Sequence, residues 1–202
     1  MQQFTEKEAE DFLEKNNFPV AERIFINKKE SLKKIKISFP WVMKISSKKI
    51  MHKARIGGVK TNINSVEMAE KYFEKISKIE NFEEAIIQKQ IIGKEAILGI
   101  KKTPEFNHVI MLGKGGSNIE KEKDVSFRAL PIKEDEIISM INDTKFSETL
   151  NRKETKNLIE SVKKLQEIIK KNTNILELDI NPLMINEQKY IIADARIVID
   201  DL

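Results

Sequence analysis

Strand-like and helix-like segments follow one another without regular alternation in this chain of 202 residues. Three apolar, strand-like segments at residues 84–90, 95–101 and 108–112 are separated only by short connections. A doubly wound parallel sheet needs a helix between successive strands, so this order argues against that fold. The short connections predict antiparallel neighbours instead, and the chain as a whole predicts a mixed α+β fold.

Local signals place the remaining elements. Thr5 and Glu8 form a capping-box pattern at the start of a helix, and Asn64 with Glu67 marks the start of another. Pro182 is expected to stop the strand that precedes it. Helices are expected at residues 5–15, 29–35, 64–79, 134–142 and 153–170. Further strands are expected at residues 23–26, 41–45, 59–63, 125–130, 175–180, 183–185 and 190–193.

The composition excludes several classes of protein. The chain contains no cysteine, which rules out disulfides, thiolate metal sites and a thiol nucleophile. Its first residues are charged, and no apolar run approaches the roughly 18 residues that span a bilayer. We therefore expect a cytoplasmic protein without a membrane segment.

Positive charge is concentrated between Lys44 and Lys60, where no acidic residue occurs, although the formal net charge of the chain is only +4. Such a segment attracts an anion, which leaves polyphosphate, nucleic acid and an acidic partner open. A single-strand nucleic-acid binder normally offers aromatic side chains for stacking. Here aromatic residues are only 6% of the chain, and this segment contains no Phe, Trp or Tyr.

Three features of the basic segment suit phosphate chemistry. Lys44 ends an apolar strand, where an ammonium group can contact a phosphate. Gly57 and Gly58 allow backbone N–H groups to approach a phosphate closely. His52 lies among cations, which favour its neutral, nucleophilic form. Each feature also has an ordinary explanation, namely a strand-end lysine that reaches water, a hairpin turn and a solvated histidine.

Polar residues near the carboxyl terminus suit a divalent cation. Glu177, Asp179 and Asn181 alternate along a strand and are expected to share one face. Asp194 ends the next strand and is expected to meet Asn181. Carboxylate and amide oxygens are hard ligands for Mg²⁺ beside phosphate, although a polar strand edge explains the same spacing. Arg128 fits either a phosphate clamp or an exposed strand arginine.

Taken in order, these segments resemble the ATP-grasp β subunits of the NDP-forming acyl-CoA synthetases. The resemblance runs over nearly the whole chain. It rests on the segments FPWVMKISSKKIMHKARIGGVK, EAILGIKKTPEFNHVIMLGKGG, KDVSFRALPI and ELDINPLMI, followed by IIADARIV. The more distant succinyl-CoA synthetase β subunit shares the Gly-Gly-Val-Lys turn and the Asn-Pro-Leu segment.

The resemblance implies one two-lobed ATP-grasp domain over residues 1–202, with nucleotide held between the lobes. The smaller lobe is expected at about residues 20–85, and the larger at about 86–202 with the amino-terminal helix. His52 matches the histidine that carries phosphate, and Asn181 and Asp194 match the Mg²⁺ ligands. The positions expected to bind nucleotide are Lys44, Gly57, Gly58, Val59, Gln88, Glu95 and Arg128.

The activity implied is that of an ADP-forming acyl-CoA synthetase, which converts acyl-CoA, phosphate and ADP into acid, CoA and ATP. A separate CoA-binding α subunit, in an αβ or α2β2 complex, would form the acyl phosphate. Its own histidine would pass the phosphoryl group to His52, and His52 to ADP. Mg²⁺ and Lys44 would offset the charge on the transferred group.

This sequence departs from the family pattern in three places. Ala54 and Arg55 stand where the family has Ser-Asp, and Lys114 replaces an apolar residue in the glycine-rich turn. The segment from Asn142 to Lys153 is shorter than usual. The alternative function is therefore a non-catalytic subunit that binds nucleotide to regulate a partner. Joint retention of Lys44, His52, Asn181 and Asp194 favours catalysis, because an inactive site need not keep all four.

Overall fold

A computed structural model describes residues 1–50, 53–116 and 122–200. The chain divides into two compact units. The large unit comprises Met1–Val20 and Ile92–Leu202, and the small unit comprises Ala21–Ile91. The small unit ends at Ile91, after strand β5 (Glu84–Lys89), whereas the smaller lobe was expected to end at about residue 85, within that strand. Within the described ranges, no helix has both the length and the apolar character needed to cross a membrane.

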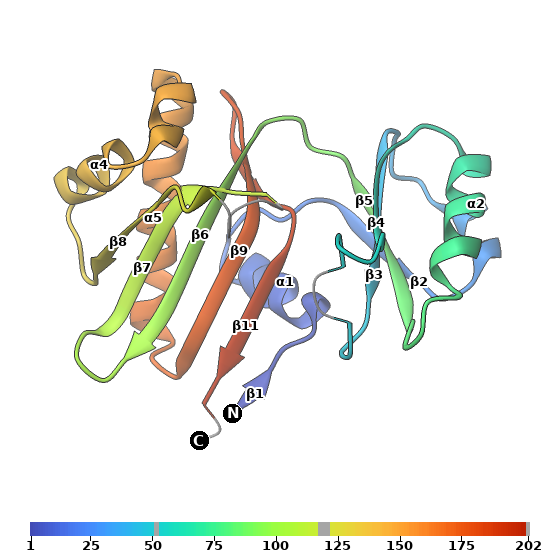
Figure 1. Cartoon of the computed structure of the whole chain (residues 1–202), viewed down its shortest axis with the longest axis horizontal. Coiled ribbons are helices and arrows are strands. Elements are labelled where there is room, and N and C mark those ends of the chain that lie inside the picture. Colours follow the sequence, from blue (N-terminus) through green and yellow to red (C-terminus); the bar gives the residue numbers. More distant parts are fainter. Residues whose placement is uncertain (51–52, 117–121, 201–202) are drawn as a thin grey trace. The chain divides into compact units, whose positions relative to one another are not determined.

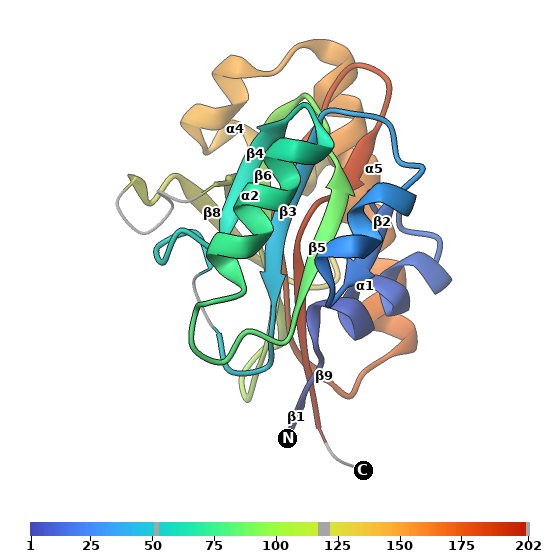
Figure 2. The ribbon, with the colours of Figure 1, turned by 90° about the vertical axis from the view of Figure 1, so that its right-hand side faces the viewer.

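The small unit is a four-stranded antiparallel sheet covered on one face by a helix (Figure 2). Its strands lie in the order β2-β5-β3-β4, with bounds β2 (Arg23–Ile26), β5 (Glu84–Lys89), β3 (Trp41–Ser46) and β4 (Val59–Ile63). Helix α2 (Val66–Ile76) and the 3₁₀ helix η1 (Lys29–Lys34) complete the unit. Buried residues of the strands, among them Met43, Ile45 and Ile87, form one core with Phe73 and Ile76 of α2.

Among the residues described, the large unit is a seven-stranded sheet with three α-helices packed on one face (Figure 1). Six strands lie in the order β1-β11-β9-β6-β7-β8, and β10 pairs with β9. Their bounds are β1 (Gln2–Gln3), β11 (Ala195–Ile199), β9 (Ile175–Ile185), β6 (Lys94–Thr103), β7 (Asn107–Lys114), β8 (Val125–Ala129) and β10 (Tyr190–Ile192). The helices are α1 (Glu6–Lys15), α4 (Glu134–Asn142) and α5 (Arg152–Lys171), with the 3₁₀ helix η2 (Lys145–Thr149). Every second residue of a strand points to the helix-covered face of the sheet. Leu98 of β6 and Leu178 of β9 are examples, and they belong to one core with Leu165 of α5.

The mixed α+β class is confirmed. The expected antiparallel pairing holds for β6 and β7. It is wrong for β5, which lies in the other sheet between β2 and β3. The expected cap of α2 is also wrong, because Ser65 accepts the hydrogen bond from the Met68 N–H at 3.2 Å. Serine and asparagine are both good caps, so spacing alone did not separate Ser65 from Asn64.

Pro182 lies inside β9 and does not stop it. Between Ile180 and Leu183, strand β9 has two residues where β6 has only Ile97 between Leu98 and Ala96. This is a β-bulge, a position at which a strand tolerates proline. Pro182 also lies where β9 changes its partner from β11 to β10, so its missing N–H interrupts neither ladder.

The short segment between α4 and α5 is firmly attached to the large unit. The backbone N–H groups of Lys145 and Phe146 each donate to the Asp124 carboxylate at 2.8 Å. Lys94 donates to the Thr149 carbonyl and forms an ion pair with Glu154, which is buried at the start of α5. Burial disfavours the charged form of Glu154, but the Lys94 contact and the Asn151 N–H outweigh it and lower the pKa of this carboxyl group.

We expect Glu154→Gln to lower the free energy of unfolding at neutral pH by about 1 kcal/mol or more, since a charge-assisted hydrogen bond is lost. Because the pKa is lower in the folded state than its ordinary 4.5, Glu154 contributes stability above that pH, and the contribution is lost on acidification. Urea unfolding between pH 7 and pH 3 should therefore show a weaker acid destabilisation in the variant. Glu160→Gln, an exposed position on the same helix, should match the wild type.

Candidate functional site

In the small unit, two of the predicted nucleotide-binding residues share the sheet face that α2 does not cover. Val42 lies opposite Gln88, and Lys44 lies opposite Ile86. Lys44 and Gln88 are therefore diagonal neighbours on adjacent strands. The alternate residues of β3, Met43 and Ile45, face the core beneath α2.

Lys44 and Gln88 are both buried, with 4% and 2% of their surface exposed. Among the described residues, the Gln88 Nε2 atom is buried without a hydrogen-bond acceptor. A buried donor without an acceptor is costly, and such groups are rare outside functional sites. The two side chains together offer an ammonium group and an amide donor, which suits the phosphates and base of a nucleotide.

The glycine turn between β3 and β4 has a well-defined backbone. Gly57 has φ +68°, a left-handed conformation that favours glycine. Its carbonyl accepts a 2.6 Å hydrogen bond from the Tyr72 hydroxyl, and burial raises the pKa of Tyr72 to about 12. The N–H groups of Gly57 and Gly58 donate within the turn to the carbonyls of Ala54 and Lys53. These two N–H groups are therefore already engaged, whereas the sequence predicted them to face phosphate.

Val59, which follows the glycine turn, pairs with Lys44 across strands β4 and β3. The turn therefore lies next to the predicted lysine. His52, the predicted catalytic residue, lies outside the described residues.

In the large unit, the two predicted metal ligands lie opposite each other. The Asn181 N–H donates to the Asp194 carbonyl at 3.1 Å, and the next pair along the ladder is Ile180 with Ala195. Side chains directly opposite on antiparallel strands have Cβ atoms about 5 Å apart. The bulge at Asn181 and Pro182 ends the ladder at this point.

The second glycine-rich turn contacts Asn181. The Gly116 N–H donates to Asn181 Oδ1 at 2.9 Å, and the Gly115 N–H donates to the Glu95 carbonyl at 2.7 Å. An added Cβ at Gly116 would lie 2.4 Å from Glu95 Oε2. The structure therefore brings Glu95, Asn181 and Asp194, which belong to separate motifs, to one end of the sheet.

Beside Asn181, charged residues cross three strands on the sheet face opposite the helices. Arg196 donates to Glu177 at 2.8 Å and to Asp179 at 3.4 Å, and Lys101 forms an ion pair with Glu177 at 3.3 Å. Gly99 lies opposite Asp179, and an added Cβ there would be 3.0 Å from Asp179 Oδ1. Burial raises the pKa of Asp179, and Arg196 opposes that shift.

Arg128 is placed apart from this cluster. It lies opposite Ile110, whose side chain is in the core, so Arg128 faces the helix-covered side of the sheet. Its guanidinium group forms an ion pair with Asp143, and it lowers the pKa of that carboxyl group. The structure therefore does not bring Arg128 to Asn181, and the ion pair attaches β8 to the end of α4.

The donor set at Asn181 and Asp194 fits Mg²⁺. The two residues offer an amide oxygen and a carboxylate, which are hard ligands. The described residues contain no cluster of three or more His, Cys, Asp or Glu able to hold a metal by themselves. Mg²⁺ is commonly held by one or two protein oxygens, with waters and substrate phosphates completing its shell, so the small donor set favours a nucleotide-bound cation.

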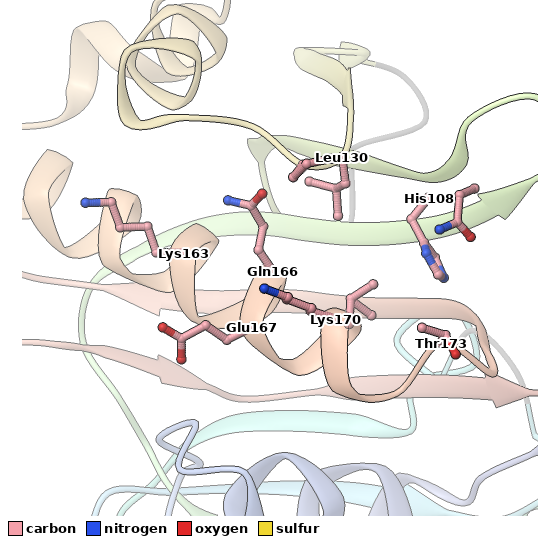
Figure 3. A pocket seen from close by; sticks show the side chains of 10 residues that line it. His108, Leu130, Lys163, Gln166, Glu167, Lys170 and Thr173 are labelled. Carbon is pink, nitrogen blue, oxygen red and sulfur yellow. The ribbon is translucent and has the colours of Figure 1, made fainter.

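A pocket of about 550 Å³ lies elsewhere in the large unit (Figure 3). It is lined by Asn107, His108, Leu130, Pro131, Lys163, Gln166, Glu167, Ile169, Lys170 and Thr173. His108 Nε2 donates to the Ile175 carbonyl at 2.9 Å, and the Gln166 amide bonds both backbone groups of Ile132. These polar groups serve the fold, and none of the predicted site residues lines the pocket.

Sequence analysis missed several members of the site. Arg196 belongs to the Asp-Ala-Arg segment, but its contacts with Glu177 and Asp179 depend on strand register. Gly116 stood out only as part of a glycine-rich turn, with no signal for its contact with Asn181. Tyr72 lies in an ordinary amphipathic helix, and its role in holding Gly57 has no sequence signal.

Comparison with known proteins matches residues 1–199 to the family model of the ATP-grasp domain. The β subunit of ADP-forming acetate–CoA ligase I from Pyrococcus furiosus is 37% identical over 150 residues, which cover 69% of this chain and 65% of that protein. The chain spans less than two thirds of the length of the first curated relatives that it matches.

Solved structures agree with this match. The dinucleotide-forming acetyl-coenzyme A synthetase 1 of Ca. Korarchaeum cryptofilum, in complex with coenzyme A, Ca-AMPCP and HgCl⁺, has a TM-score of 0.87 and 29% identity, with coverage of 98% of this chain and 94% of that chain. A second structure of that protein contains coenzyme A and Mg-AMPPCP, with its phosphohistidine segment pointing towards the nucleotide-binding site. It has a TM-score of 0.81, 31% identity and coverage of 98% and 93%. The expected ATP-grasp fold is confirmed.

We expect Arg196→Gln to raise the pKa of Asp179 further, because Arg196 is the main group that stabilises the Asp179 carboxylate against burial. Carboxyl ¹³C chemical shifts followed by NMR between pH 3 and pH 8 measure this pKa directly. The control is Lys102→Gln, because the Lys102 ammonium group of the wild type contacts the Thr173 carbonyl and not Asp179. This variant should leave the Asp179 titration unchanged. Equal titration curves in Arg196→Gln and the wild type would contradict the assigned contact.

Proposed function

The chain belongs to the ATP-grasp family, and on this basis we propose that it is the nucleotide-binding β subunit of an ADP-forming acyl-CoA synthetase. The observation that carries the proposal is the placement of Asn181 opposite Asp194, with the Gly116 N–H on the Asn181 amide. Its support from relatives is the similarity to β subunits of ADP-forming acetate–CoA ligases. The proposed reaction is acyl-CoA + phosphate + ADP ⇌ acid + CoA + ATP.

We assign nucleotide binding to residues of both units. In the small unit, Lys44 would contact phosphate, and Gln88 would donate its buried amide N–H to the nucleotide. Gly57, Gly58 and Val59 would shape the turn at the phosphate end, with Tyr72 holding that turn in place.

In the large unit, Asn181 and Asp194 would hold Mg²⁺, and Glu95 would approach the nucleotide from β6. When bound, Mg²⁺ neutralises charge on the phosphates and orients them for transfer. Arg128 has no part in this assignment, because its guanidinium group is engaged by Asp143 on the other face of the sheet.

We propose His52 as the phosphoryl carrier within this chain. A phosphohistidine of the partner α subunit would transfer its phosphoryl group to a ring nitrogen of His52, breaking one P–N bond and forming another. A terminal β-phosphate oxygen of ADP would then attack that phosphorus, giving ATP and free His52. The cations flanking His52 in sequence, Lys53 and Arg55, would stabilise the phosphoryl charge.

The proposed partner is a CoA-binding α subunit that forms the acyl phosphate. An αβ pair or an α2β2 complex would serve the same chemistry. The acid is proposed to be a small carboxylic acid, in keeping with the acetate–CoA ligases among the relatives.

The nucleotide site is tested by calorimetric titration of the purified chain with ADP and AMPPCP, with Mg²⁺ and then with EDTA. We expect Mg²⁺-dependent binding that Asn181→Ala/Asp194→Ala weakens by about 100-fold or more, because both oxygen ligands are lost. Asp135→Ala/Asn142→Ala, an exposed pair of the same residue types on α4, is the matched control. Wild-type binding without any Mg²⁺ dependence would contradict the proposal.

The phosphoryl relay is tested separately with His52→Ala and an α subunit. We expect ATP formation from acyl-CoA, phosphate and ADP to be abolished, while Mg²⁺-dependent nucleotide binding is retained. Acid-labile, base-stable ³²P labelling of the wild-type chain should disappear in the variant. Unchanged ATP formation would reject the relay, and nucleotide binding without any ATP formation in the wild type would favour the regulatory alternative.

A further inference from the structure

In the turn that follows β7, two glycines lie against the neighbouring strands. The Gly115 N–H donates to the Glu95 carbonyl at 2.7 Å, and an added Cβ at this position would lie 2.4 Å from the Ala96 carbonyl oxygen. Gly116 has φ +99°, in the left-handed region that L side chains rarely adopt. Glycine at both positions lets the backbone itself, rather than a side chain, reach the Asn181 amide.

Both polar groups of Gly116 meet the Asn181 amide. Its N–H donates to Asn181 Oδ1 at 2.9 Å, and its carbonyl accepts from Asn181 Nδ2 at 3.5 Å. A half-turn of the amide would set Nδ2 against the N–H and Oδ1 against the carbonyl, so the two contacts together discriminate between the amide orientations.

The orientation matters for a hard cation. Mg²⁺ binds the amide oxygen of asparagine and not its nitrogen. The Asn181 Oδ1 atom has two lone pairs, and the Gly116 N–H uses one of them, so the other remains for a cation. Groups that orient a metal ligand in this way contribute strongly to metal affinity.

We infer that Gly116 is a positioning residue for the Mg²⁺ site, and that its backbone holds Asn181 Oδ1 in the metal-binding orientation before and after the cation binds. The inference rests on the proposed function, because it takes Asn181 as a metal ligand. The second glycine-rich turn would thus orient a metal ligand, a role that does not follow from the ATP-grasp match alone. The opposing model is a placeholder, in which the N–H occupies Oδ1 only until the metal displaces it.

Gly116→Ala is the direct test. Its Cβ would meet the flexible end of Glu95, which can move, but alanine disfavours φ +99°, so the turn should shift away from Asn181. We expect the enhancement of AMPPCP affinity by Mg²⁺, measured calorimetrically, to fall by at least about tenfold. Affinity for AMPPCP in EDTA is measured beside it, so that any effect of a displaced Glu95 on nucleotide binding is separated from the effect on Mg²⁺. The inference requires that the Mg²⁺ enhancement, which is the ratio of the two affinities, falls.

The matched control is Asn107→Ala. Asn107 has φ +59° at the opposite end of the same strand, so this variant also places alanine in a left-handed conformation, without touching Asn181. We expect this variant to keep the wild-type Mg²⁺ enhancement. Circular dichroism and thermal melting of both variants show whether each is folded. An unchanged Mg²⁺ enhancement in folded Gly116→Ala would overturn the inference.

A second measurement needs no variant. ¹⁵N-glycine labelling of the wild type gives amide signals from only seven glycines, and triple-resonance spectra assign Gly116 among them. With Mg-AMPPCP bound, we expect a shifted Gly116 amide signal that stays protected from hydrogen exchange, as positioning requires. Loss of that protection on metal binding would establish the placeholder model and overturn the inference. If the wild type shows no Mg²⁺-dependent nucleotide binding at all, the proposed function fails first and this inference falls with it.

Discussion

The β-bulge in β9 is the local feature on which the candidate metal site depends. Two residues of β9, Asn181 and Pro182, occupy the space that faces the single residue Ile97 of β6. The extra residue ends one ladder and starts another, because β9 pairs with β11 before the bulge and with β10 after it. Asn181 is thereby placed beside Asp194 and within reach of the turn at Gly116.

The regular sheet around the bulge supplies the rigidity that such a site needs. Strand β9 lies between β6 and β11, and its core-facing residues, among them Leu178 and Ile180, pack beneath α5. A binding residue on a strand held from both sides is positioned more accurately than one on a loop. In the small unit, β3 has the corresponding place between β5 and β4, and it supplies Lys44.

Much of the fold could be predicted from local sequence, because the signals were local. The capping box at Thr5, the helical spacing of α5 and the alternation of β3 each depend on a few neighbouring residues. Assignment of β5 to a sheet could not be predicted, since it depends on which of two cores buries Ile87. The continuation of β9 through Pro182 was missed for a similar reason, because a bulge is a property of two strands and not of one.

In the candidate site too, some residues have a local sequence signal, whereas other contacts depend on the pairing of distant strands. Lys44, Asn181 and Asp194 could be named as candidates from residue type and strand position, and the family resemblance suggested their roles. Arg128 shows the limit of that reasoning, since its side of the sheet depends on the register with β7. The Gly116 contact with Asn181 joins residues 65 positions apart in the chain, so no local pattern could indicate it.

Lys94 and Glu95 are adjacent in sequence, yet they serve opposite sides of the sheet. Lys94 holds Glu154 and Thr149 at the start of α5, whereas Glu95 lies at the Gly116 turn. Loss or gain of one residue in β6 would exchange these sides and turn the core residues Ala96 and Leu98 outward. A change in the length of β6 therefore needs a compensating bulge like the one in β9, whereas substitutions in β6 and length changes in the hairpin at residues 104–106 need none.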